Sequence, residues 1–209
     1  MKTISIVIIL GSILFLAGSF SPMSSVYMEP TAEGKLTIIQ SSPGGWVLKQ
    51  VLYSLGALLT AGGFSAAAYR LRGSISRLYI PITLTLLAAT IFFLAYAVFR
   101  TVNPEAWVQI PPPHPQFLAY TFLTQAGMLL LGVALLQSGY PRWLGWLITG
   151  SMVALFVLTV IFRDMPPLAY YLLGLVVGFV LLRRKQPFQQ QQSQKATDRN
   201  ELKSMLEES

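Results

Sequence analysis

Apolar runs long enough to cross a lipid bilayer recur along the whole chain, and mostly short polar segments separate them. A helix needs about 20 apolar residues to cross the hydrocarbon core, because its backbone polar groups must be hydrogen-bonded within the segment. Six runs meet or approach this length: residues 4–20, 46–68, 78–99, 117–137, 143–162 and 167–182. The pattern therefore predicts an all-α, polytopic membrane helical bundle of about six transmembrane helices within residues 1–185.

The first run has two interpretations. Lys2, the apolar stretch after it and the small residues Ala17, Gly18 and Ser19 resemble a secretory signal peptide. The apolar stretch, however, approaches the length of a membrane span. We expect a retained helix; cleavage would leave five helices.

Two segments lie outside the predicted bundle. Residues 21–45 form an external loop with several prolines, long enough to fold back over the outer face, and residues 36–39 (Leu-Thr-Ile-Ile) predict a short strand. Residues 186–209 are polar and contain a run of glutamines at 189–192. This composition predicts a disordered tail, which we expect on the cytoplasmic side.

Composition supports a membrane protein. Hydrophobic residues make up 54% of the chain and charged residues 11%, with a mean hydropathy of +0.58. Soluble domains carry about 25% charged residues, so this chain is better suited to lipid than to water. The net charge of +7 does not indicate nucleic-acid binding, because the cations lie between and after apolar runs. Cysteine is absent, which excludes disulfides, thiolate metal sites and cysteine nucleophiles.

The distribution of Lys and Arg predicts the orientation. Cytoplasmic loops of membrane proteins are enriched in both residues. If the N-terminus is cytoplasmic, the inner side holds most of them and the outer side holds few. The inner set is Lys2, Arg70, Arg72, Arg77, Arg142, Arg183, Arg184, Lys185, Lys195, Arg199 and Lys203, and the outer set is Lys35, Lys49, Arg100 and Arg163. We therefore expect both termini in the cytoplasm and a multi-pass protein of the cytoplasmic (plasma) membrane.

The spans carry little that could do chemistry. Their middles contain no Asp, Glu, Lys, Arg or His, which weakens the case for proton-coupled transport, voltage sensing and carboxylate-based proteolysis. Hydrolase, zinc-protease, phosphate-loop and dinucleotide-binding motifs are absent as well. The sole histidine, His114, follows a run of prolines and cannot by itself build a zinc or haem site. Nothing in the sequence supports an enzyme, and we expect no cofactor.

Gln125 is the most polar residue in the middle of a span, with Thr121 on the same helix face and Thr124 beside it. These groups could contact a solute. A glutamine at such a depth more often hydrogen-bonds to a neighbouring helix, and we expect this structural role. The spacing of Gly174 and Gly178 is typical of close helix contacts, which we expect within the chain rather than between two copies.

A second candidate site lies at the outer ends of the spans, where polar and aromatic residues gather. Together with the long loop they could form an external pocket for an anion, a lipid head group or a loop of a partner. We expect ordinary interfacial anchoring instead, with Lys49 reaching outward to water and the tryptophans in the interfacial belt. This outer-rim set is Trp46, Lys49, Arg100, Glu105, His114, Arg163 and Asp164, with Asn103 and Trp107 nearby.

Residues 135–147 read Leu-Leu-Gln-Ser-Gly-Tyr-Pro-Arg-Trp-Leu-Gly-Trp-Leu. This stretch resembles a turn between two spans in a family of six-helix bacterial membrane proteins known only as a domain of unknown function. In that family a small polar pair ends one helix and a Pro-Arg-Trp-Leu turn leads into the next. The order of spans and the long first external loop are similar too. The resemblance implies a prokaryotic membrane protein and brings no activity with it.

Two functions lead from the sequence, and a membrane enzyme that uses the outer-rim residues His114, Glu105 and Asp164 is a third option. The first is a non-catalytic accessory, sensing or assembly component, which the missing mid-span charge and catalytic motifs favour. The alternative is a carrier or binder of a small neutral or lipidic solute, through Gln125 and its threonines or through the outer rim. Expected partners are the lipid bilayer and other membrane proteins or a second copy of the chain, and not nucleic acid.

Overall fold

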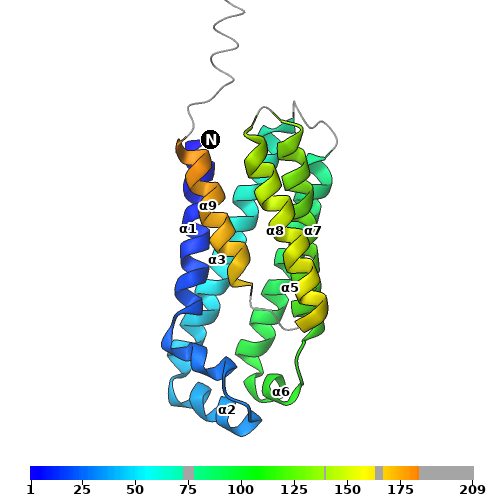
Figure 1. Ribbon diagram of the computed structural model, residues 1–209. Helices are drawn as coiled ribbons and strands as arrows, with labels where there is room; N and C mark the ends of the chain where they lie inside the picture. The colour runs from blue at the N-terminus through cyan, green and yellow to red at the C-terminus, as the bar shows by residue number, and fades with distance from the viewer. Residues whose placement is uncertain (73–77, 139, 163–166, 184–209) are drawn as a thin grey trace, which may run out of the picture.

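The computed structural model describes residues 1–72, 78–138, 140–162 and 167–183, and these ranges contain helices and no strand. The long helices stand side by side in one bundle (Figure 1). In chain order the elements are α1 (Lys2–Ser19), η1 (Pro22–Tyr27), α2 (Ala32–Ser41), α3 (Pro43–Arg70), α5 (Tyr79–Val102), α6 (Pro104–Gln109), α7 (Pro115–Leu136), α8 (Arg142–Phe162) and α9 (Leu168–Arg183).

Five of the described helices, α1, α3, α5, α7 and α8, are long and apolar enough to cross a membrane. The chain is therefore an all-helical, multi-pass membrane protein. The last predicted span, α9, is apolar but has only 16 residues. It begins partway along the bundle, well short of the end that α3 and α5 reach (Figure 1).

The long helices pack in the order of the chain, except that the last one returns to the first. The main contacts join α1 to α3, α3 to α5, α5 to α7 and α7 to α8, while α9 returns to lie against α1. The first and last helices are thus neighbours (Figure 1). Ile8 and Phe15 of α1 are buried in the same core as Tyr171 and Val177 of α9.

Glycines allow the closest of these approaches. A Cβ atom on Gly56 of α3 would lie 2.7 Å from the backbone nitrogen of Phe15 in α1. On α9, a Cβ atom on Gly174 would meet the Ser12 hydroxyl, and one on Gly178 would meet Ile9. As expected, Gly174 and Gly178 make their close contact within the chain, where dispersion between approaching backbones stabilises helix pairs in lipid.

The external segment is helical, and the prediction of a strand at residues 36–39 is wrong. These residues belong to α2, whose N-terminus is capped by Thr31, with the side chain accepting a hydrogen bond from the Gly34 N–H at 3.1 Å. Helix α3 then begins at Pro43, earlier than the expected Trp46, because a proline is well tolerated in the first helical turn.

Three short elements, η1, α2 and α6, close one end of the bundle, and we call them the cap (Figure 1). Helix α2 contacts both η1 and α6. The cap has a hydrophobic core of its own, which it shares with the ends of α3 and α5. The buried members of this core are Met23, Val26, Ile39, Trp46, Tyr96 and Trp107.

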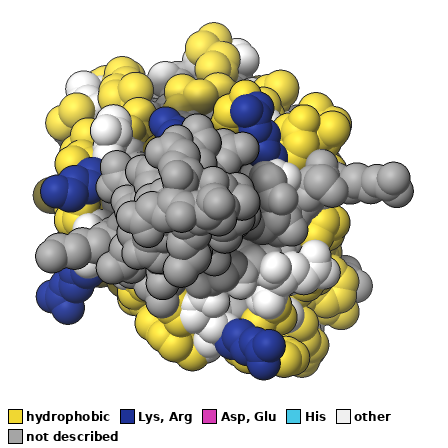
Figure 2. Space-filling view, turned by 90° about the horizontal axis from the view of Figure 1, so that it is seen from above, with side chains coloured by type: hydrophobic (Ala, Val, Ile, Leu, Met, Phe, Trp, Pro, Cys, Tyr) yellow, Lys and Arg dark blue, Asp and Glu magenta, His cyan; other side chains and the backbone are white. Residues whose placement is uncertain are grey.

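Charge divides the two ends of the molecule. The end opposite the cap displays Lys and Arg side chains and, among the described residues, no acidic one (Figure 2). Its cations come from the helix ends and turns there: Lys2, Arg70, Arg72, Arg142 and Arg183. The described acidic residues, Glu29, Glu33 and Glu105, all belong to the cap segments. Arg77, Gly139, Arg163, Asp164 and the predicted tail lie outside the described residues.

Candidate functional site

A cavity of about 460 Å³ lies where the cap meets the bundle. Aromatic and apolar side chains of the bundle, among them Phe15, Phe93 and Leu168, line part of its wall. The cap contributes polar side chains, including Ser24, Tyr27 and Lys35. Small-molecule sites in proteins occupy about 300–1,000 Å³ and combine an apolar wall with a few convergent polar groups, so this cavity has the size and composition of a binding site.

Arg100, in the last turn of α5, brings a positive charge into this wall although it is only 3% exposed. Aromatic rings surround its guanidinium, with centroids 4.7 Å away for Tyr96 and 5.4 Å for Tyr53. The Nη1 group donates a hydrogen bond to the Tyr27 hydroxyl at 2.7 Å. The Trp46 indole N–H donates to the backbone oxygen of Arg100 at 3.1 Å, so helices α3, α5 and η1 together hold this residue.

The other edge of the same guanidinium has no partner among the described residues. Both Nε and Nη2 of Arg100 are buried and make no hydrogen bond. These two N–H groups lie side by side along one edge of the plane, a fork that matches the two oxygens of a carboxylate or phosphate. Because a buried charge without a counter-ion costs several kcal/mol, the free edge of Arg100 has the chemistry to bind an anion.

Lys49 lies nearby on α3, and the expectation that it reaches outward to water is wrong. It is 1% exposed, and its ammonium donates to the Ser24 hydroxyl at 2.7 Å. The ammonium also lies 4.6 Å from the centroid of the Tyr27 ring. The cap covers the end of α3 and supplies these partners, so Lys49 points into the structure. No described carboxylate pairs with Lys49 or with Arg100.

Tyr27 connects the two cations. Its residue is 43% exposed, yet its hydroxyl group lies beside buried Arg100. Desolvation raises the pKa of Tyr27 well above its ordinary value and outweighs the opposing effect of the Arg100 charge. The phenol therefore stays neutral at physiological pH, and it accepts the Arg100 hydrogen bond without cancelling the positive charge.

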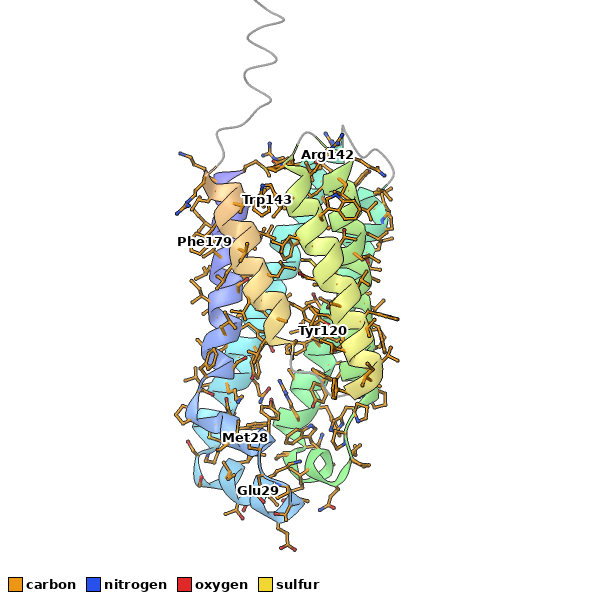
Figure 3. All side chains as sticks on the ribbon, in the orientation of Figure 1. Met28, Glu29, Tyr120, Arg142, Trp143 and Phe179 are labelled. Carbon is orange, nitrogen blue, oxygen red and sulfur yellow. The ribbon has the colours of Figure 1, made fainter. Side chains whose placement is uncertain are left out.

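The tryptophans fall into two classes. Trp46 and Trp107 are 2% and 5% exposed and belong to the cap core, so the expectation that they sit in the interfacial belt is wrong. Trp143 and Trp146, at the opposite end, are 54% and 64% exposed, as belt residues are (Figure 3).

His114 completes the aromatic wall. It is 6% exposed, lines the cavity, and stacks on the Trp107 ring with centroids 6.0 Å apart. Its other neighbour is Tyr96, whose hydroxyl accepts a hydrogen bond from the Trp107 indole N–H at 3.1 Å. The histidine thus belongs to a stacked aromatic group between α5 and α6.

The structure brings together only part of the predicted outer rim. Arg100 and His114 line the cavity. Trp46 and Lys49 do not line it but donate hydrogen bonds to two residues that do, Arg100 and Ser24. Glu105 is exposed in the first turn of α6 and does not line it. Arg163 and Asp164 lie outside the described residues. Sequence reasoning missed most of the lining residues, among them Tyr27, Lys35 and Tyr53. Tyr27 and Lys35 come from cap elements that were read as a loop with a strand, so no local pattern pointed to them.

Gln125 and its threonines lie elsewhere and do not form a joint site. The Gln125 amide donates to Thr159 of α8 at 2.8 Å and to the Tyr170 hydroxyl of α9 at 2.5 Å. Thr121 donates to the carbonyl of Phe117 in its own helix. Thr124 lines a separate cavity of about 30 Å³, with room for about one water molecule. Gln125 therefore joins three helices, in the structural role expected for it.

No family model, curated protein or solved structure matches this chain. The resemblance of residues 135–147 to the six-helix bacterial family stays a prediction.

Proposed function

We propose that this protein is a membrane-embedded binding protein for a ligand with a carboxylate or phosphate group, held beneath the cap. The single observation that carries the proposal is Arg100, 3% exposed and lining the cavity, with the Nε–Nη2 edge of its guanidinium free. A fully buried fork of this kind recognises a two-oxygen anion by paired, charge-assisted hydrogen bonds.

The surroundings favour a negative ligand over a neutral one. Lys35 lines the same cavity, and Lys49 is buried beside Tyr27, so three cations lie around it. No described carboxylate faces them from the wall. Of the two leading functions, these features support the binder, with an anionic rather than a neutral solute. Binding of this kind is also compatible with a sensing or accessory component of the cytoplasmic membrane.

We also propose a membrane topology of six segments with both termini in the cytoplasm. The cations at the end opposite the cap support this orientation, because cytoplasmic ends are enriched in Lys and Arg. In this topology the cap and its cavity face the outside. Helix α9, about 24 Å long, serves as the sixth segment although it falls short of the roughly 30 Å of the hydrocarbon core.

Ligand-induced thermal stabilisation of the purified chain in neutral detergent tests the binding proposal. Dodecanoate and dodecyl phosphate should raise the unfolding temperature, and dodecanol, which has the same chain without a charge, should not. Arg100→Gln should weaken binding by about 10- to 150-fold, because a hydrogen bond to a charged group contributes about 1.5–3 kcal/mol. Arg100→Lys should retain part of the affinity, since it keeps the charge and loses the fork.

Arg142→Gln, at the opposite end of the molecule, is the matched control and should bind like the unmodified chain. Equal stabilisation by dodecanol and dodecanoate, or unchanged binding by Arg100→Gln, would rule out an anion site at Arg100.

A further inference from the structure

The position of the cavity along the helices identifies the kind of molecule that can reach it. A helix rises about 1.5 Å per residue, so Lys49 lies about 32 Å from Arg70 along α3, and Arg100 about 32 Å from Tyr79 along α5. The rings of Tyr69 and Tyr79 are in contact, with centroids 6.0 Å apart. The end of α3 and the start of α5 therefore lie at the same depth, and the two distances can be compared. The hydrocarbon core is about 30 Å thick, and both buried cations therefore lie at its far boundary.

The apolar part of the cavity lies deeper. Phe15 is about 20 Å from Lys2 along α1, and Leu168 is about 22 Å from Arg183 along α9. The start of α1 at Lys2 and the end of α9 at Arg183 lie at the same end of the bundle as the end of α3 at Arg70, as the course of these helices in Figure 1 shows. Phe15 and Leu168 are thus about 10 Å inside the hydrocarbon core, measured from the level of Arg100. One cavity joins a cationic group at the membrane surface to an apolar wall within the membrane.

The way in runs along the side of the molecule. Helices α2 and α6 lie across the end of the bundle and contact each other. They cover the buried core that contains Val26, Ile39 and Trp107. Met28, which lines the cavity, is 87% exposed and marks its mouth. It sits on the flank of the cap, below the first turn of α9 in the view of Figure 3. An exposed methionine at the membrane boundary suits contact with lipid rather than with water.

We propose that the ligand is an anionic lipid of the outer leaflet, which enters sideways past Met28. Its carboxylate or phosphate binds the free edge of Arg100, and the first part of its chain lies against Phe15 and Leu168. At about 460 Å³ the cavity takes the head group and the start of one chain, and the rest of the chain stays in the bilayer. This inference rests on the anion site of the proposed function and adds the bilayer as the source of the ligand.

Tryptophan fluorescence in vesicles tests it. In a Trp143→Phe/Trp146→Phe background the remaining emission comes from Trp46 and Trp107, both beside the site. Phosphatidylglycerol with a brominated chain, diluted into phosphatidylcholine vesicles, should quench this emission several-fold more than brominated phosphatidylcholine at the same mole fraction. Arg100→Gln should abolish the difference. Leu168→Phe should reduce the difference in quenching, because the larger ring takes up space in the part of the cavity that holds the lipid chain.

The outcomes separate the two proposals. Equal quenching by both brominated lipids overturns the lipid inference and leaves the anion site standing, provided that dodecanoate still stabilises the chain in detergent through Arg100. Equal quenching without that stabilisation overturns both. Preferential quenching that persists in Arg100→Gln also overturns the inference, because the head group is then bound elsewhere.

Discussion

At the scale of single residues, two buried polar side chains, Gln125 and Arg100, differ in how their N–H groups are used. Gln125 donates both of its amide hydrogen bonds to residues of other helices, Thr159 and Tyr170. Arg100 uses one of its nitrogens on Tyr27 and leaves an edge unpaired. Both residues are buried at the 2–3% level. What distinguishes Arg100 is that its unpartnered atoms belong to a charged group in the wall of the cavity, and this supports the binding role proposed for it.

Gln125→Leu should therefore destabilise the fold and leave ligand binding intact. Interhelical hydrogen bonds in membranes contribute about 0.6–2 kcal/mol, and the substitution removes those from Gln125 to Thr159 and to the buried Tyr170 hydroxyl. The free energy of unfolding in detergent and the affinity for dodecanoate measure the two effects. Thr121→Val is the control, because Thr121 bonds only within its own helix and its loss should change stability little. A lost affinity at unchanged stability would instead make Gln125 part of the binding site.

At the scale of elements, some helix pairs in this bundle approach closely because a glycine at the contact has no side chain. Gly56, Gly62 and Gly63 share one segment of α3, yet they differ in their surroundings. A Cβ atom on Gly56 would collide with the backbone of α1, which cannot move aside alone, whereas a Cβ atom on Gly62 would meet nothing within 4 Å.

Gly56→Ala should cost about 1–3 kcal/mol by overpacking the contact of α1 with α3. Gly62→Ala should be neutral or stabilising by up to about 1 kcal/mol, since alanine is the better helix former. Comparing the unfolding of the two variants in the same detergent removes the shared change in composition. Equal effects would mean that α1 and α3 do not meet at Gly56.

The elements also show where prediction from sequence stops. The spans were predictable, because a helix in lipid satisfies its hydrogen bonds locally and leaves a continuous apolar run. Helix α2 was misread, since Leu36, Ile38 and Ile39 have the composition of a strand. The segment is helical instead: the Thr31 side chain caps the N-terminus of α2, and Ile39 is buried in the cap core. The contacts of Arg100 join residues 54 and 73 positions apart, and no local pattern encodes such distances.

At the scale of the whole molecule, the two ends differ in the charged residues that they carry, and the sequence contains no cysteine. The cap segments carry the described acidic residues, and the opposite end carries the exposed Trp143 and Trp146 and the cations of the helix ends. This polarity makes the orientation in the membrane directly measurable with introduced cysteines.

Single cysteines at Gln40, Gln109 and Gln137 should react from opposite sides of intact cells. Gln40 and Gln109 are exposed on the cap and should be labelled by a membrane-impermeant maleimide added outside. Gln137, exposed between α7 and α8, should be labelled only after the membrane is made permeable. The unmodified chain provides the background, because it contains no thiol. The reverse pattern would invert the proposed topology.

The pairing of α1 with α9 has a consequence for how the protein is made. During synthesis α1 reaches the membrane before the other described helices, and α9 reaches it after them. The face of α1 that receives Gly174 and Gly178 must therefore stay available, in contact with lipid or a helper protein, while all the intervening helices are inserted. The wall of the cavity that contains Leu168 is completed only when α9 arrives. A chain truncated before α9 would still contain the five long helices, but its cavity would lack the wall that Leu168 supplies.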